Sequence, residues 1–233
     1  MRDLREDLDP VWRATARLSS AASGAGEGKV MMFVSARVGE GVTSMAASFA
    51  CMAARRSEKP VWLVDLDLRQ NPVYHGFQDG FARDVGRPGR AYDASLRQVP
   101  FYQITPGAEG TRQDKLLTAH DVEGLPLLVT RFRGDRLKPG QKVRTQHAPE
   151  WWQALRKLSS WAVIDAPALE RSSAALTMAQ VADGIVLVVS ADQTTAAEIE
   201  SARQELEANQ GRVLGVVMNG VRGDARLAER FSA

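Results

Sequence analysis

The chain has 233 residues, of which 44% are hydrophobic and 25% charged, and its net charge is +2. These values are typical of a soluble globular protein with one core, and they give no reason to expect nucleic acid as a partner. No apolar run reaches the roughly 20 residues of a membrane-spanning helix, residues 1–9 are too charged for a secretory signal, and the single cysteine excludes an intramolecular disulfide. We therefore expect a cytoplasmic protein whose membrane association, if any, depends on a partner or a surface patch.

The N-terminal segment, residues 1–28, is expected to form a helix and a linker. Asp9 and Pro10 are typical of an N-cap followed by the first helical residue. The helix would continue to about Ser20, and a stretch rich in Gly and Ser would follow it as a linker. The main domain would then cover residues 29–233.

Short apolar runs of buried-strand type alternate with helical segments through most of this domain. Strands are expected over residues 30–35, 61–64, 161–164, 185–190 and 213–218, and helices over residues 43–56, 149–158, 174–181 and 195–211. The last helix begins with a capping box formed by Thr195 and Glu198. This alternation predicts an α/β fold with a doubly wound, mostly parallel sheet and helices on both faces.

The segment 78–148 interrupts the alternation and holds many of the Gly, Pro and Arg residues. We expect an irregular insertion there, with candidate strands over 101–104 and 127–132. Within it, residues 131–144 contain six basic side chains and one acid. Such a run can contact anionic lipid or an acidic partner segment, or it can be an ordinary solvated loop.

A glycine-rich loop follows the first expected strand and has the sequence Ser-Ala-Arg-Val-Gly-Glu-Gly-Val-Thr-Ser over residues 35–44. A P-loop surrounds phosphate with backbone N–H groups and adds the positive end of the following helix. The lysine that normally precedes the Thr or Ser supplies charge to the β- and γ-phosphates. Here that position holds Val42. By itself, the loop is equally consistent with any tight strand-to-helix turn.

Two later strands end in carboxylates. Asp65 and Asp67 lie in the sequence Leu-Val-Asp-Leu-Asp-Leu-Arg, and residues two apart on a strand project to the same side. Asp165 ends the strand Trp-Ala-Val-Ile-Asp. Carboxylates at the carboxyl ends of parallel strands suit Mg²⁺ coordination and activation of a nucleophile. Solvated strand ends are the alternative, and a lone Asp165 is unspecific.

Taken together, "SARVGEGVTS", "LVDLDLRQNP" and "VIDAP" occur in the order found in one family. The chain resembles the bacterial tyrosine kinases of capsule and exopolysaccharide synthesis, which are relatives of the MinD/ParA ATPases. The resemblance covers roughly residues 29–77 and 155–221. It implies a P-loop NTPase-like fold, ATP or ADP with Mg²⁺ as ligands, and a membrane-embedded polysaccharide co-polymerase as partner at the inner membrane.

The resemblance also implies roles for individual residues. The phosphates would be surrounded by Val38, Gly39, Glu40, Gly41, Val42, Thr43 and Ser44. Mg²⁺ would be held by Thr43, Asp65 and Asp165. Asp67 would lie beside the reacting γ-phosphate, as a working or a vestigial catalytic group. Asn219 falls where relatives use an Asn near the adenine, and a simple Asn-Gly turn is the alternative.

Two positions where the related loops carry lysine decide what the loop can do. Val42 removes the lysine of the family's pattern. Arg37 lies five residues earlier, where MinD-type loops carry a second, signature lysine. It could supply the missing charge, although arginine and lysine are not interchangeable. The alternative is an Arg37 that faces the surface.

The family's other sequence features are incomplete. Its kinases usually carry a C-terminal tyrosine cluster, whereas the tyrosines of this chain are Tyr74, Tyr92 and Tyr102. We therefore expect no C-terminal autophosphorylation. The N-terminal helix of the family carries a Glu-x-x-Arg-x-x-Arg motif that builds a ring, and here Arg13 alone matches. Homo-oligomerisation is therefore an open alternative to a monomer.

Two functional hypotheses follow. In the first, the chain is a catalytically degenerate, kinase-like subunit that regulates polysaccharide chain assembly or export through the co-polymerase. In the second, it is a weakly active ATPase or protein-tyrosine kinase acting on a separate substrate, with Arg37 or a partner's residue replacing the lysine. Val42 and the missing tyrosine tail favour the first hypothesis, and the retained Asp65, Asp67 and Asp165 favour the second. A partitioning ATPase is a third option, which the Gly-Glu-Gly loop and the Asp-Leu-Asp-Leu-Arg strand oppose.

Overall fold

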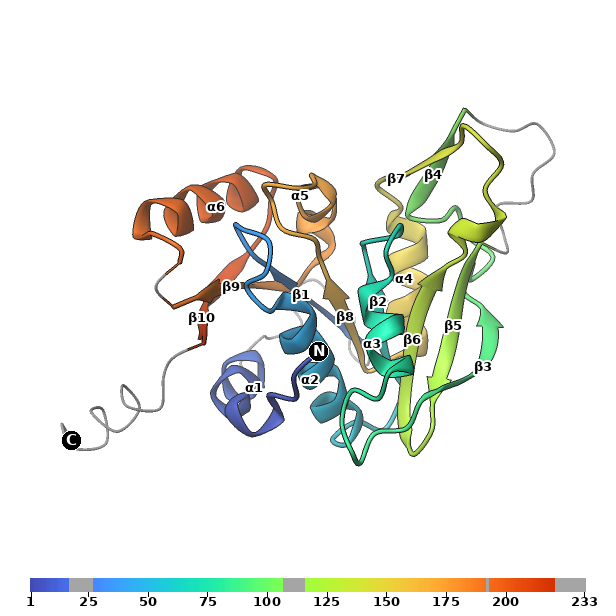
Figure 1. Ribbon diagram of the computed structural model, residues 1–233, viewed down its shortest axis with the longest axis horizontal. Coiled ribbons are helices and arrows are strands. Elements are labelled where there is room, and N and C mark those ends of the chain that lie inside the picture. The colour runs from blue at the N-terminus through green and yellow to red at the C-terminus, as the bar shows by residue number, and fades with distance from the viewer. Residues whose placement is uncertain (17–26, 107–115, 192, 221–233) are drawn as a thin grey trace.

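The computed structural model describes residues 1–16, 27–106, 116–191 and 193–220. Within these residues, eight strands form one sheet in the order β10-β9-β1-β8-β2-β6-β5-β3 (Figure 1). The strands are β1 Lys29–Val34, β2 Val61–Asp65, β3 Pro88–Asp93, β5 Leu117–Val122, β6 Leu125–Phe132, β8 Trp161–Asp165, β9 Gly184–Ser190 and β10 Val213–Asn219. Pairing is parallel from β10 to β6 and antiparallel from β6 to β3. The prediction of a doubly wound, mostly parallel sheet is confirmed.

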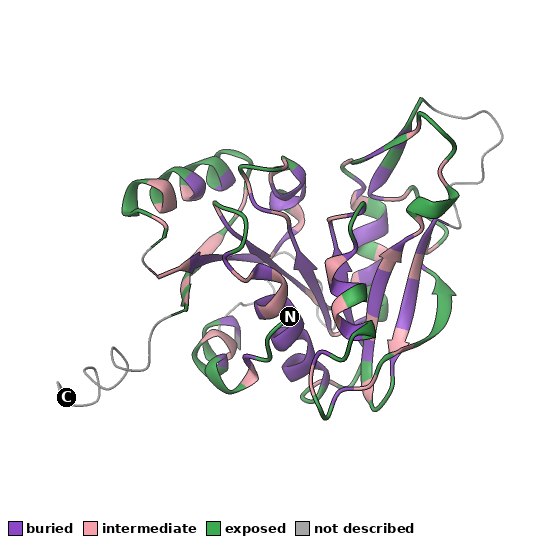
Figure 2. Ribbon diagram, viewed as in Figure 1, coloured by how far each residue is buried: buried purple, intermediate pink, exposed green. Residues whose placement is uncertain are grey.

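The sheet is covered on both faces, because its central strands alternate their side chains between two apolar clusters. In β1, Met31 and Phe33 belong to the cluster on one face, whereas Val30, Met32 and Val34 belong to the cluster on the other. The first face is covered by α2 (Val42–Ala54) and α3 (Pro72–Gln78), and the second by α4 (Pro149–Leu158), α5 (Ala174–Met178) and α6 (Ala196–Ala208). Figure 2 shows the resulting contrast between the buried central strands and the exposed outer side of α6.

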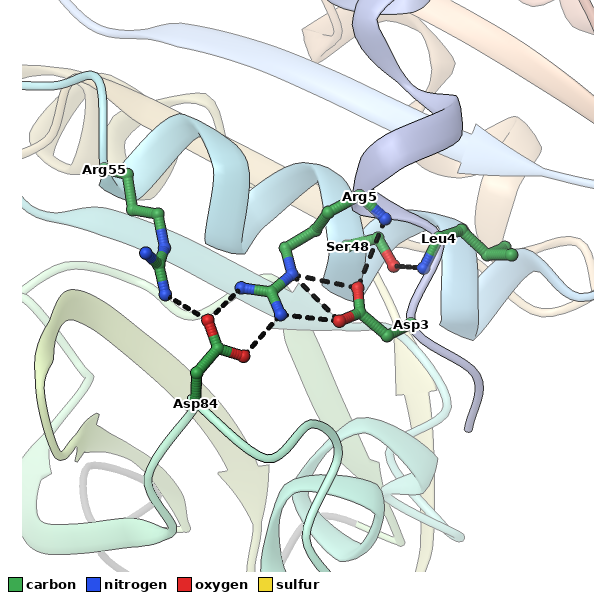
Figure 3. A network of polar contacts seen from close by, with 6 residues as sticks. All are labelled: Asp3, Leu4, Arg5, Ser48, Arg55 and Asp84. Carbon is green, nitrogen blue, oxygen red and sulfur yellow. Dashed lines mark hydrogen bonds and ion pairs between the residues drawn. The ribbon is translucent and has the colours of Figure 1, made fainter.

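The N-terminal segment packs against α2. Helix α2 is buried almost all round, so it needs a cover on the side away from the sheet. That cover is the short helix η1 (Arg5–Asp7) and α1 (Asp9–Ala16), with Leu4 and Leu8 buried against the helix. The N–H of Leu4 donates to Ser48 Oγ at 2.8 Å (Figure 3). Beyond residue 16, the expected helix end and linker lie outside the described residues.

Charged groups hold the same segment in place (Figure 3). The guanidinium of Arg5 pairs with Asp3 and with Asp84, each at 2.5 Å, and Arg55 pairs with Asp84 at 2.6 Å. These contacts join residues at the start of the chain to α2 and to the loop after α3. The pKa of Asp84 is lowered to about 2, first by its hydrogen bond from Arg5.

The segment 78–148 is more regular than the sequence indicated. Strands β3, β5 and β6 extend the main sheet, and β4 (Tyr102–Thr105) pairs antiparallel with β7 (Lys142–Thr145) as a separate two-stranded sheet. The expected strands 101–104 and 127–132 correspond to β4 and β6. The sequence missed β3 because an exposed edge strand needs no apolar alternation, and its sequence is Pro-Gly-Arg-Ala-Tyr-Asp.

The other expected helices are present, with ends that differ by up to three residues from those expected. The capping box at Thr195 is confirmed, since its side chain accepts from the Glu198 N–H while the Glu198 carboxylate accepts from the Thr195 N–H. The helix that it starts, α6, ends at Ala208. Within the described residues, no helix combines the length and the apolar character needed to cross a bilayer.

Candidate phosphate-binding site

The glycine-rich loop joins β1 to α2 at the carboxyl end of the parallel strands. Gly39 and Gly41 have φ angles of 89° and 92°, a region that favours glycine. A Cβ on Gly41 would also lie 2.1 Å from Asn219 Nδ2. Among the described residues, no acceptor takes the backbone N–H groups from Gly39 to Ser44. The loop therefore presents a row of free donors of the kind that binds phosphate.

Two side chains that the sequence assigned to ligand binding also support the loop. The carboxylate of Glu40 is buried and accepts from the N–H groups of Arg37 (3.0 Å) and Ser190 (2.9 Å). It also accepts from the Thr194 hydroxyl. Asn219 Nδ2 donates to the Glu40 carbonyl at 2.9 Å. These bonds tie the loop to the ends of β9 and β10, and the proposed contact of Asn219 with adenine stays a prediction.

A cavity of about 260 Å³ opens beside the loop. Its lining includes Gly39, Gly41, Thr43, Asp67 and Arg171. The volume lies just below the range typical of small-ligand sites, roughly 300–1,000 Å³. It suits a phosphate-bearing end of a ligand better than a whole nucleotide.

Val42 occupies the lysine position at the first residue of α2. Its side chain is 8% exposed and belongs to the apolar cluster that includes Phe33 and Met45, while its edge lines the cavity. The sequence interpretation placed Val42 among the residues that surround the phosphates. The structure buries most of its side chain, because α2 packs its apolar side chains against the sheet.

Asp65 and Asp165 end the neighbouring strands β2 and β8 and are direct partners in the parallel register. Both are buried, at 2% and 3% exposure. Burial, then the nearby Asp165 carboxylate, raises the pKa of Asp65 well above its ordinary value. Burial raises the pKa of Asp165 to about 7, and a hydrogen bond from Thr43 opposes this increase.

The two carboxylates differ in what they bond. Asp65 Oδ1 accepts from the Asp67 N–H at 2.8 Å, and its Oδ2 accepts from the Val73 N–H at 3.1 Å. It therefore shapes the loop before α3, and neither Asp65 nor Asp165 is among the residues that line the cavity. Asp165 Oδ1, in contrast, is buried without a hydrogen-bond partner in the described structure. Asp165 with Thr43 fits a Mg²⁺ site, whereas direct ligation by Asp65 stays a prediction.

Of the two alternatives for Arg37, the structure agrees with the arginine that faces the surface. Arg37 points away from the cavity and pairs with Glu198 of α6 at 2.6 Å. Arg171 is the one cation among the described residues that line the cavity, and its Nη2 forms an ion pair with Asp67 Oδ2. The Asp67 side chain is 12% exposed. The carboxylate expected beside the γ-phosphate is therefore engaged by an arginine.

The sequence and the fold of the chain are similar to those of known proteins. No family model matches the chain. Tyrosine-protein kinase YwqD of Bacillus subtilis (strain 168) is 25% identical over 192 residues, which are 82% of this chain and 72% of that protein. The kinase domain of the Escherichia coli tyrosine kinase ETK is 17% identical with a TM-score of 0.53, covering 85% of this chain and 69% of that one. The MinD cell division protein of Aquifex aeolicus is 17% identical with a TM-score of 0.51, covering 88% of this chain and 74% of that one.

The chain is similar in sequence to a bacterial tyrosine-protein kinase, and it shares the fold of the ETK kinase domain and of MinD. Its glycine loop and the ends of β2 and β8 are the segments that the resemblance predicted, and the fold brings them to one end of the sheet.

Two charged residues beside the glycine loop were missed in the sequence. Glu170 and Arg171 lie in the loop after β8, and Glu170 Oε1 accepts from the Val38 N–H of the glycine loop at 2.6 Å. One signal was available. Loops that follow parallel strands lie at the ligand-binding edge of a sheet, so two charges shortly after the strand of Asp165 were candidates by position.

Proposed function

We propose that this chain is a catalytically degenerate, kinase-like subunit. It binds a nucleotide weakly through its glycine loop and does not transfer phosphate at a rate typical of a kinase. It acts instead by regulating polysaccharide chain assembly or export through a membrane-embedded co-polymerase. The observation that carries the proposal is the cation arrangement at the loop, where Val42 replaces the lysine and Arg171 is paired with Asp67.

The charge arrangement argues against efficient phosphoryl transfer. Catalysis of this reaction depends on positive groups placed where negative charge develops on the transferring phosphate. Val42 contributes no such charge, and Arg37 is directed to Glu198. Arg171 could reach a phosphate only by giving up its ion pair with Asp67. A phosphate bound at the loop would thus be held mostly by main-chain N–H groups.

Weak nucleotide binding is still supported by the remaining groups. The free N–H groups of residues 39–44 and the positive end of α2 are supplied by the backbone and do not require lysine. Thr43 and Asp165 would hold Mg²⁺, which would neutralise phosphate charge when bound. The retention of these groups favours a regulatory nucleotide over complete loss of binding.

The partner and the location rest on the resemblance to the polysaccharide kinases. We place the subunit on the cytoplasmic face of the inner membrane, where a co-polymerase would recruit it. The test is membrane fractionation with and without that partner. If the chain pellets without the partner and is released by salt, the basic run 131–144 is the contact, because salt weakens surface electrostatics.

A second candidate is a slow ATPase or protein-tyrosine kinase. One observation favours it: Arg171 already lines the cavity and is a better placed substitute cation than Arg37. Turnover by the unmodified chain at a rate typical of kinases, lost in Arg171→Gln and kept in Arg37→Gln, would select this candidate and exclude the degenerate subunit.

The substitution Val42→Lys tests the proposal directly. A charge-assisted hydrogen bond is worth about 1.5–3 kcal/mol, or about 10- to 100-fold in affinity. We therefore expect Val42→Lys to tighten Mg·ADP binding at least several-fold. The assay is the increase in melting temperature caused by Mg·ADP, compared between variants so that any general loss of stability cancels.

The matched control is Val42→Met, which is also long and unbranched but carries no charge. It should leave the Mg·ADP-dependent shift at the level of the unmodified chain. If Val42→Lys and Val42→Met give the same shift, the missing charge is not what limits binding. If neither variant nor the unmodified chain responds to Mg·ADP, the nucleotide part of the proposal is wrong.

A further inference from the structure

A second, larger cavity adjoins the glycine loop. Its volume is about 690 Å³, compared with about 260 Å³ for the cavity beside the loop. The two cavities share Asp67, Gln70, Pro167 and Arg171 in their linings. A volume of this size falls within the range of roughly 300–1,000 Å³ typical of small-molecule sites.

Three segments that are distant in the sequence enclose the larger cavity. They are the loop after β2 (residues 66–70), the β4–β7 pair (Gln103 with residues 143–145) and the loop after β8 into the start of α5 (residues 167–174). Figure 1 shows the β4–β7 pair at the end of the sheet toward which the β6 and β8 arrows point. The insertion therefore supplies one wall of this cavity.

The lining is rich in arginine. Arg69, Arg144 and Arg171 line the cavity, against the single carboxylate of Asp67. Arg171 and Asp67 neutralise each other. Within the described residues, Arg69 and Arg144 have no acidic partner. Two guanidinium groups therefore remain to balance an anionic ligand.

The uncharged polar groups fit the same class of ligand. Gln103 lies opposite Arg144 in the β4–β7 register, so both side chains project from one face of the pair. The hydroxyls of Thr145, Ser172 and Ser173 add further groups that can donate hydrogen bonds. Guanidinium forks combined with hydroxyl donors recognise phosphate oxygens.

We propose that this cavity binds a phosphorylated small molecule, separate from any nucleotide at the glycine loop. Its phosphate lies between Arg69 and Arg144, and the rest of the ligand fills the space toward Asp67 and Arg171. The basic run 131–144, for which lipid contact and a solvated loop were the alternatives, contributes Arg144 to this site. The ligand would thus lie beside Asp67, the residue that the resemblance places next to the γ-phosphate.

The test is calorimetric titration with inorganic pyrophosphate as the probe, in EDTA at low salt. Arg144→Gln keeps a polar side chain on an exposed position of β7 and removes the charge, so it should fold normally. We expect it to weaken pyrophosphate binding at least tenfold, and Arg69→Gln to do the same. The matched control is Arg136→Gln, which removes an exposed arginine of the same insertion outside the cavity and should change affinity less than twofold.

The variant Thr43→Ala separates this site from the glycine loop, because Thr43 lines the smaller cavity and not the larger one. It should leave pyrophosphate affinity within twofold. If Thr43→Ala abolishes binding and Arg144→Gln does not, the probe binds at the glycine loop; the present inference then fails while the proposed function stands.

Three other results would also overturn the inference. One is the absence of pyrophosphate binding at millimolar concentration, and another is an equal loss in Arg144→Gln and Arg136→Gln, which would indicate only general charge. The third is Arg144-dependent sedimentation with phosphatidylglycerol vesicles without binding of free pyrophosphate. That result would assign the arginines to a lipid surface.

Discussion

The buried carboxylate of Asp165 makes stability depend on pH in a way that one substitution can reveal. Burial raises its pKa from the ordinary 3.8 to about 7. Between these values the folded chain binds more protons than the unfolded chain, so the free energy of unfolding falls as the pH rises from about 4 to about 7. The neighbouring Asp65 shifts in the same direction, first through burial and then through the charge of Asp165.

The substitution Asp165→Asn should remove this loss. A raised pKa of about three units, at ~1.4 kcal/mol per unit, corresponds to on the order of 4 kcal/mol. Asparagine keeps an acceptor for the Thr43 hydroxyl and carries no charge at any pH. We expect Asp165→Asn to exceed the unmodified chain in stability by up to about 4 kcal/mol at pH 8, and to differ by less than about 1 kcal/mol at pH 4.

Urea denaturation in EDTA at both pH values measures the effect. The control is Asp135→Asn, whose side chain is 60% exposed and should alter stability little at either pH. Mg²⁺ should stabilise the unmodified chain at pH 8 and not Asp165→Asn, because a ligand of the folded state raises stability. If Asp165→Asn is the less stable chain at pH 8 in EDTA, the ionised carboxylate has a favourable partner and the reasoning from burial is wrong.

Three further substitutions test other parts of the structure. Thr195→Ala removes the capping box of α6 and should lower the free energy of unfolding by about 1 kcal/mol, measured by urea denaturation, whereas no loss would mean that the cap is not formed in solution. Arg37→Ala should leave Mg·ADP affinity unchanged in calorimetry, since its partner is Glu198, and a tenfold loss would identify Arg37 as the substitute cation. Leu8→Ala should cost about 2–5 kcal/mol in thermal or urea unfolding, because Leu8 is 1% exposed against α2, and a change below 1 kcal/mol would show that the N-terminal cover is dispensable.

Much of the fold could be predicted because its signals are local. The buried strands β1, β2, β8 and β9 are short apolar runs, and the Thr195 capping box lies within four consecutive residues. The glycine loop could also be placed, because a strand, two glycines and a Thr before an Ala-rich segment are adjacent in the chain. Strand β3 could not be placed, because an exposed edge carries no apolar period.

By itself, the sequence determined the α/β class, the position of the glycine loop and the presence of Val42 where the family's pattern has lysine, since each depends on residues within one short segment. Only the tertiary structure decided what the charged groups do. Asp67 and Arg171 are 104 positions apart and meet in an ion pair, whereas Arg37, a few residues from Val42, faces α6 instead. The physical reason is that a side chain's partners depend on which loops the sheet order brings together. Attraction between exposed charges is screened beyond roughly 10 Å, and sequence separation does not measure that distance.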